Sequence, residues 1–402
     1  MRSVYIGILA IYYYYIYKYL TATPTSEAPY TFSEQVGKGK PKLASNSYVD
    51  FKSPPSHEKL GKENATIVML VRNRELESAL SSMRSLEDRF NRNYHYPWVF
   101  LNDVPFTQEF IDQTRLMASG EVFHELIPAD DWNPPPYIDE EKLNENLVNS
   151  SNVIYGGSRS YRNMCHFNSG FFFRQKKLME YDWYFRVEPD VQYLCDFDYD
   201  PFTYLRETGK IYGFVTAIHE YENTIPTLWP TVEKFMSEYP HLLHPNNSLD
   251  YITTNETELN YLVPLVNSSS SYNLCHFWSN FEIGNLNFWR SEAYLTYFNY
   301  LSKSGGFHYE RWGDAPIHSI GLNLLADKSK IHHFDDIGYY HAPYMACPTS
   351  KDLRTFKRCI CKAEMNGEII TEPYDVSIYS CLSRWWRYGS GKKFISEVDY
   401  HR

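Results

Sequence analysis

The chain has 402 residues, of which 43% are hydrophobic, and its formal net charge is −10. This length suffices for one large or two ordinary globular domains with packed cores. The acidic balance argues against a nucleic-acid partner, because such proteins carry a basic stripe on the binding face.

An uncharged stretch near the N-terminus, residues 4–17, is preceded by Arg2 and followed by Lys18. Extended to residues 4–20, it reaches the lower limit of the roughly 17–25 residues that a membrane-spanning helix needs. A cleaved signal peptide and an interfacial helix are the alternatives for so short and tyrosine-rich a segment. We predict an uncleaved signal anchor over 4–20, with a cytoplasmic tip at residues 1–3.

Residues 21–63 are rich in Thr, Ser, Pro, Lys and Gly and have almost no apolar periodicity, which predicts a luminal stem rather than a domain. At Ala65 the character of the chain changes, and we expect one folded domain over 64–402. The apolar runs predict strands at 65–71, 97–101, 121–127, 183–188 and 211–217 and helices at 75–90, 176–181 and 229–239. Strands alternating with helices indicate an α/β fold with a largely parallel sheet. The proline- and acid-rich residues 128–152 and the Asn- and Ser-rich residues 245–271 are expected to be irregular.

Seven cysteines and five glycosylation sequons are consistent with a luminal domain. The cysteines lack the Cys-x-x-Cys spacing of a zinc site, so we expect up to three disulfides and one thiol left over. Their connectivity cannot be derived from the spacing. The sequons begin at Asn64, Asn149, Asn246, Asn255 and Asn267.

The most informative strand ends in two acids around a proline, Glu188-Pro189-Asp190. Proline cannot donate to a central ladder, so the strand should stop there. Ligands of open α/β sheets collect at the carboxyl ends of strands, and carboxylates at such an end suit a divalent ion that bridges to phosphates. The alternative is a surface turn whose acids are merely solvated.

Other residues could complete such a site. Arg72 follows the first strand, and Arg162 lies in a cationic cluster that would complement a diphosphate. Glu282 is flanked by apolar residues, where a carboxylate is costly unless it is paired or functional. Asp314 sits at a turn, and a segment near the C-terminus supplies three histidines that could bind a metal, His332, His333 and His341.

Four segments together resemble the fungal Golgi α-1,2-mannosyltransferases of glycosyltransferase family 15. They are residues 155–172, 184–191, 272–282 and 336–341, in this order along the chain. The resemblance implies a GT-A fold, a type II Golgi membrane protein, and transfer of mannose from GDP-mannose with retention of configuration. It implies Mn²⁺ as cofactor and a mannosyl glycan or glycoprotein as acceptor.

The same resemblance implies roles for individual residues. Glu188 and His341 correspond to the Mn²⁺ ligands, and Glu282 corresponds to the candidate nucleophile. Tyr161 and Asp314 match further catalytic positions, and the donor is expected to be bound by Arg72, Arg162 and Asp190. Two rival hypotheses stay open: a mannosylphosphate transferase that uses the same donor, and a non-catalytic luminal subunit that binds mannan.

Overall fold

The computed structural model describes residues 63–254, 271–361 and 380–391, all of which lie in one compact unit, Asn46–Arg402. The predicted anchor lies outside these ranges, as does the predicted stem apart from Glu63. Within the described ranges, no helix is both long and apolar enough to span a bilayer.

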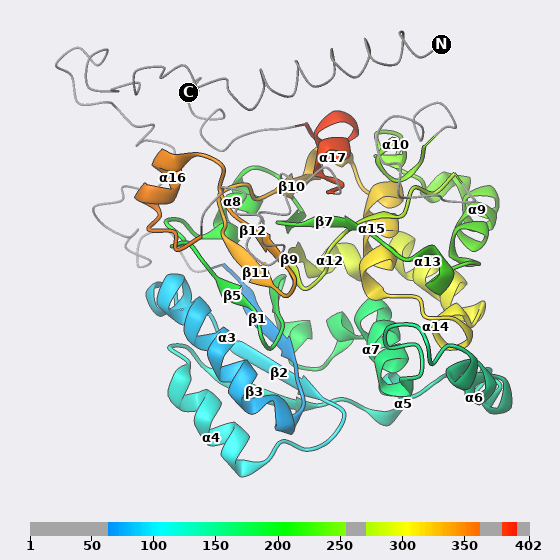
Figure 1. Ribbon diagram of the computed structural model, residues 1–402, viewed down its shortest axis with the longest axis horizontal. Helices are drawn as coiled ribbons and strands as arrows, with labels where there is room; N and C mark the ends of the chain where they lie inside the picture. Colours follow the sequence, from blue (N-terminus) through cyan, green and yellow to red (C-terminus); the bar gives the residue numbers. More distant parts are fainter. Residues whose placement is uncertain (1–62, 255–270, 362–379, 392–402) are drawn as a thin grey trace, which may run out of the picture. The chain divides into compact units, whose positions relative to one another are not determined.

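A seven-stranded sheet forms the centre of the unit (Figure 1). In spatial order its strands are β10 (Ile331–His333), β6 (Tyr212–Phe214), β9 (Phe281–Asn285), β4 (Trp183–Val187), β1 (Ala65–Leu70), β2 (Trp98–Asn102) and β3 (Val122–Leu126). All neighbouring strands are parallel except β9, which runs antiparallel to β4 and β6. The prediction of a mixed, mostly parallel sheet is confirmed.

Two small antiparallel sheets accompany the central one. One contains β5 (Gln192–Tyr193), β11 (Tyr339–His341) and β12 (Tyr344–Ala346), and the other pairs β7 (Ala217–His219) with β8 (Cys275–Phe277). The longer helices are α3 (Leu76–Arg89), α4 (Gln108–Met117), α6 (Glu140–Asn149), α7 (Arg159–Gly170), α9 (Leu228–Glu238), α13 (Glu292–Lys303) and α15 (Asp314–Leu325). Shorter ones are α5 (Ala129–Trp132), α8 (Pro201–Glu207), α10 (Leu249–Ile252), α12 (Leu286–Trp289), α14 (Gly306–Tyr309), α16 (Lys351–Phe356) and α17 (Leu382–Tyr388).

Each face of the central sheet has its own core, because side chains alternate along a strand. Ile67 and Met69 of β1 pack with α3, whereas Val68 packs on the opposite face with α7, α13 and α15. On β4, Tyr184 belongs to this second core. Arg186, two residues further along the strand, therefore points toward the same layer as Tyr184.

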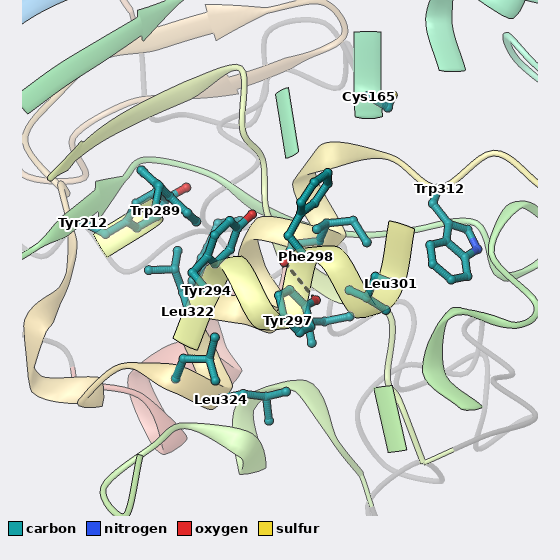
Figure 2. Packing of buried hydrophobic residues seen from close by; sticks show 14 of the residues in the cluster. Cys165, Tyr212, Trp289, Tyr294, Tyr297, Phe298, Leu301, Trp312, Leu322 and Leu324 are labelled. Atoms are coloured by element: carbon teal, nitrogen blue, oxygen red, sulfur yellow. Dashed lines mark hydrogen bonds between the residues drawn. The ribbon is translucent and has the colours of Figure 1, made fainter. Parts of the chain in front are cut away.

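The second core is rich in aromatic rings, as Figure 2 shows. Tyr294, Tyr297 and Leu301 of α13 lie beside Leu322 of α15, and Trp289 at the end of α12 packs against Tyr294 at a centroid distance of 4.7 Å. These rings are fully or almost fully buried. They form a rigid support for the residues of α15 that approach the sheet.

Three local predictions from the sequence were wrong. The segment predicted to be irregular, 128–152, contains α5 and α6, because Asp139 caps α6 by accepting a hydrogen bond from the Lys142 amide. The predicted helix 176–181 is only a 3₁₀ turn, Leu178–Glu180, since six residues are too few to sustain an α-helix without support.

The third error concerns residues 245–271, of which 255–270 lie outside the described ranges. Within the described part, α10 buries Tyr251 and Ile252 completely. The predicted strand 211–217 is present, but it divides into β6 and β7 because the chain passes from the central sheet to the two-stranded one. The remaining predicted strands and helices agree with the structure to within two residues at their ends.

Three disulfides form, as the cysteine count allows, and Cys165 is left as a buried thiol. The bonds join Cys195 to Cys359, Cys275 to Cys381, and Cys347 to Cys361. They attach the last part of the chain to the domain.

A buried lysine adds a second attachment for this part of the chain. Lys357 is 0% exposed, and its Nζ lies 2.9 Å from Asp198 and also contacts Asp336. Burial opposes its charge, but Asp336 and Asp198 outweigh this effect and raise the pKa of Lys357. The lysine is therefore held in its charged form between two acids.

We predict that Lys357→Met destabilises the fold by about 3–5 kcal/mol, because it leaves two buried carboxylates without their cation. Chemical denaturation followed by tryptophan fluorescence measures this loss. The matched control is Lys351→Met, which alters an exposed lysine on α16. Equal midpoints for the two variants would contradict the prediction.

Candidate active site

The candidate site lies where β4 ends and continues into Glu188. The strand register places Glu282 of β9 directly opposite Arg186, so both side chains leave the sheet on one face. The first residue of α15, Asp314, reaches the same place. We call Arg186, Glu188, Glu282 and Asp314 the Arg186 cluster.

Arg186 contacts all three acids of the cluster. Its Nε donates to Glu188 Oε1 at 2.7 Å, and its Nη1 donates to Asp314 Oδ2 at 2.5 Å. Nη1 also lies 3.6 Å from Glu282 Oε1. The Arg186 side chain is 12% exposed and that of Glu282 is 0% exposed, so these charges interact with little screening by water.

The charge states of the cluster follow from burial and from these contacts. Burial opposes ionisation of Arg186, but Asp314, Glu188 and Glu282 together raise its pKa well above the ordinary value. Burial also opposes ionisation of Asp314, yet Arg186 outweighs it and holds the pKa of this carboxyl below its usual range. For Glu188, burial prevails over Arg186 and raises the pKa. Of the groups described here, Glu188 is thus the acid whose ionised form a further cation would stabilise.

His341 is the last residue of β11, which pairs with β5. Its Nε2 is 3.8 Å from Asp190 Oδ1. Its Nδ1 lies 3.0 Å from the carbonyl oxygen of Ala342, which can only accept a hydrogen bond. Nε2 therefore carries the free lone pair, as a metal ligand requires.

Glu188, Asp190 and His341 offer the oxygen and nitrogen ligands that a divalent ion such as Mn²⁺ accepts. The Asp190 side chain is 69% exposed, and its φ of 67° lies in the left-handed region, which Asp tolerates better than most residues. In the described part of the chain, the ligand atoms of Glu188, Asp190 and His341 do not all lie within 4.8 Å of one another. The assignment of these residues to a metal stays a prediction.

Two tighter groups of potential ligands exist among the described residues, and both consist mainly of cysteines. They are Cys195, Cys359 and Cys361, and His219, Cys275 and Cys381. All of these cysteines form disulfides, so they offer no thiolate to a metal.

Tyr161 lies in the first turn of α7, and Arg72, which follows β1, reaches the same turn with its side chain. The Tyr161 hydroxyl accepts a hydrogen bond from Arg311 Nη1 at 3.2 Å, and Arg311 also pairs with Glu220 at 3.2 Å. Burial is the main reason why the pKa of Tyr161 is raised well above its ordinary value, so the phenol stays protonated. Arg72 donates to the Ser160 hydroxyl at 2.6 Å, so its guanidinium contacts the residue that precedes Tyr161 in α7.

Arg162 has different surroundings. Its guanidinium is completely buried and donates to backbone carbonyl oxygens, those of His308, Gly156 and Asn146. These contacts favour a structural role in holding the loop before α7. The predicted donor contact of Arg162 stays a prediction.

His332 and His333 lie on β10 at the edge of the central sheet, where β10 pairs with β6. His333 is buried and its Nε2 lies 3.0 Å from the carbonyl oxygen of Val215. Of the three histidines considered from the sequence, His341 is therefore the one that approaches Glu188 and Asp190.

Sequence reasoning did not identify Arg186, Arg311 or Ser279 as site residues. Ser279 donates at 2.8 Å to Asp314 Oδ2, the oxygen that Arg186 also contacts, and so helps to fix this acid. The signal for Arg186 was available, because it lies two residues before Glu188 and must share its side of an extended strand. Arg311 could not be found in this way, since only the packing of α7 against the loop after α14 brings it to Tyr161.

A sheet of this topology, with acids at a strand end beside a histidine, defines the class of glycosyltransferases with a GT-A fold. The chain belongs to the family of glycolipid 2-alpha-mannosyltransferases, which it matches over residues 24–390. It is therefore a mannosyltransferase by family, and the sequence-based assignment is confirmed.

Relatives of known sequence and structure agree with this assignment. "Probable mannosyltransferase KTR2" of Saccharomyces cerevisiae is 53% identical over 362 residues, which cover 88% of this chain and 83% of the relative. "Alpha-1,2 mannosyltransferase KTR1" of the same yeast is 47% identical over 81% of this chain and 78% of its own length. The crystal structure of core-mannan synthase A from Aspergillus fumigatus, in its Mn/GDP form, is 37% identical with a TM-score of 0.75, covering 89% of this chain and 93% of that one. The mannosyltransferase Ktr4p of S. cerevisiae in complex with GDP is 38% identical with the same TM-score, over 84% of each chain.

We predict that Arg186→Gln destabilises the protein in a pH-dependent way. The folded-state pKa of Asp314 lies below its unfolded value of about 3.9, so its pairing with Arg186 stabilises the fold above that pH and is lost as the pH falls. The melting temperature of the variant should therefore fall clearly below that of the parent protein from pH 7 down to about pH 4, and the gap should narrow as the pH falls further, through the folded-state pKa of Asp314. A gap that stays the same below about pH 4 would contradict the pairing.

Proposed function

We propose that this protein transfers mannose from GDP-mannose to the 2-hydroxyl of a mannose-terminated glycan, with retention of the α configuration. The observation that carries the proposal is the Arg186 cluster together with its neighbours Asp190 and His341. The cluster supplies a buried carboxylate, Glu282, and Glu188 with these two neighbours supplies acid and histidine ligands that suit a metal and a diphosphate. The Mn/GDP form of core-mannan synthase A, with the same fold, supports the same donor chemistry here.

Glu188, Asp190 and His341 would hold Mn²⁺. When bound, this ion offsets the negative charge that develops on the leaving diphosphate. Asp314 stays ionised through its contacts with Arg186 and Ser279, and in this way it keeps the guanidinium in place. Arg72, next to α7, and Arg311, which holds Tyr161, supply further positive charge close to the donor.

Glu282 has the charge and the position for a role at the anomeric carbon. In a retaining reaction it either attacks this carbon and is then displaced, or it stabilises the positive charge while the acceptor attacks from the side of the leaving group. In the second case a phosphate oxygen takes the proton of the acceptor hydroxyl. Both routes need a carboxylate whose position is fixed before the sugar arrives.

We propose further that the enzyme works in the Golgi lumen, held by the anchor predicted at residues 4–20. The glycosylation sequons and the three disulfides support an oxidising, luminal environment. The acceptor would be an O- or N-linked mannan chain.

The function is tested by incubating the purified protein with GDP-mannose, Mn²⁺ and methyl α-mannoside and determining the product by NMR. The expected product is an α-1,2-linked dimannoside, and its formation should stop in excess EDTA and resume when Mn²⁺ is restored. A product that carries mannosyl phosphate would favour the rival transferase. No product with any mannose acceptor would favour the non-catalytic hypothesis.

We predict that His341→Ala weakens Mn²⁺-dependent GDP binding by about 10-fold or more, because it removes the nitrogen ligand. Isothermal titration of GDP in the presence and absence of Mn²⁺ measures the effect. The matched control is His241→Ala, an exposed histidine away from the site, and both variants should keep the melting temperature of the parent protein. Unchanged Mn²⁺-dependent binding would remove His341 from the metal site.

We predict that Glu282→Gln lowers turnover by about 10²-fold or more, the scale for loss of one electrostatic stabiliser of a transition state. GDP binding should persist, because the metal-binding and diphosphate-binding groups are unchanged. The matched control is Glu292→Gln, an exposed glutamate on α13. If Glu282 only stabilises the core, Glu282→Gln should instead lower both the melting temperature and the affinity for GDP.

A further inference from the structure

A histidine of α15 lies directly behind Glu282. The Nδ1 of His318 is 3.1 Å from Glu282 Oε2, and its Nε2 is 3.0 Å from the carbonyl oxygen of Asn168. The residue is completely buried, and its ring stacks on Trp289, one of the rings in Figure 2, at a centroid distance of 4.3 Å. The ring is therefore held between two fixed polar atoms.

The two contacts require a proton between His318 and Glu282. The carbonyl oxygen of Asn168 can only accept, so Nε2 carries a hydrogen. A neutral ring in this form has a lone pair on Nδ1, which would face the lone pairs of an ionised carboxylate. A hydrogen bond across the 3.1 Å contact thus needs one further proton, on Nδ1 or on Oε2.

The two oxygens of Glu282 have different surroundings. Oε2 is anchored, since it also accepts a hydrogen bond from the Tyr212 hydroxyl at 3.1 Å. Oε1 has no hydrogen-bond partner within the described part of the chain, and it lies 3.6 Å from Arg186 Nη1. Arg186 and Glu282 both line a small pocket beside Tyr184, Leu70 and Asn168.

We propose that His318 is a positioning residue for mannose transfer: with Tyr212 it fixes Glu282 through Oε2 and leaves Oε1 free to face the donor sugar. The inference rests on the proposed function, in which Glu282 acts at the anomeric carbon.

Other charged and titratable groups surround this pair on every side. Tyr184 and Arg186 approach from β4, Tyr212 from β6 and Tyr294 from α13, and Asp314 lies one turn earlier on α15. Burial is the main reason why the pKa values of the three tyrosines are raised, so they stay protonated. Arg186 is shared with Asp314 and Glu188. Among the described residues, Glu282 is the only carboxylate that His318 contacts.

The test compares His318→Phe, which keeps a ring but removes both nitrogens, with His318→Asn, whose amide can donate to Oε2 in place of Nδ1. We expect kcat of His318→Phe to fall by about 10²-fold, the scale for misplacing a reacting group by about 1 Å. For His318→Phe, we expect KM for GDP-mannose and Kd for GDP to change by less than about threefold. His318→Asn should regain a clear part of the lost kcat, because positioning depends on a retained hydrogen bond.

Two further variants serve as reference points. His166→Asn removes another buried histidine, on α7, which lies 2.7 Å from the Ser302 hydroxyl, and it should change melting temperature without changing kcat. Tyr212→Phe removes the second anchor of Oε2 with little change in packing, and kcat should fall while GDP affinity persists. This variant keeps the inference testable if His318→Phe does not fold.

Combining the His318 variants with Glu282→Gln tests the positioning role of His318 separately from the proposed role of Glu282. If His318 acts through Glu282, His318→Asn has no further effect on kcat in the Glu282→Gln background. Normal turnover of Glu282→Gln would refute the role of Glu282 in the proposed function. Slow turnover of Glu282→Gln together with normal kcat of His318→Phe or Tyr212→Phe would overturn the positioning role alone, as would a parallel loss of kcat, melting temperature and GDP affinity.

Discussion

One buried guanidinium holds the site together. Arg186 contacts Glu188, Glu282 and Asp314, three carboxylates that would otherwise repel one another in a region of low dielectric. Because a guanidinium has five donors in a fixed plane, it can pair with several acids and also fix their directions. The acids at the end of β4, in the middle of β9 and at the start of α15 are therefore ordered by the same side chain.

The cluster divides into two halves with different environments. Toward the surface, Glu188 lies near Asp190 and His341, whose side chains are 69% and 28% exposed. Toward the core, Glu282 is enclosed by aromatic side chains and anchored by His318 and Tyr212. These two environments suit the proposed function, in which the leaving diphosphate needs charge compensation from an ion and Glu282 needs a fixed position.

The last part of the chain contributes to the outer half. Cys195 follows β5 closely and Cys347 follows β12, so the bonds to Cys359 and Cys361 tie both ends of the small sheet to one segment. This sheet carries His341, and Lys357 between Asp198 and Asp336 fastens the same segment to the domain. Stability of this part of the chain and the position of His341 are thus coupled.

The sequence by itself determined the elements and the chemistry of the acids. Apolar runs and helical periodicity identified most strands and helices, and the Glu-Pro-Asp strand end, with the resemblance to a mannosyltransferase family, indicated the fold and the reaction. Short elements such as α6 and α10 were missed, because their stability comes from caps and tertiary contacts rather than from periodicity.

What only the tertiary structure decided was which polar residues meet. Arg186 faces Glu282 through the register of an antiparallel strand pair, and His318 reaches Glu282 through the packing of α15 on the sheet, while Arg162 turns to backbone carbonyls instead. Such contacts join residues up to 150 positions apart, as between His318 and Asn168, and local sequence carries no information about the packing that creates them.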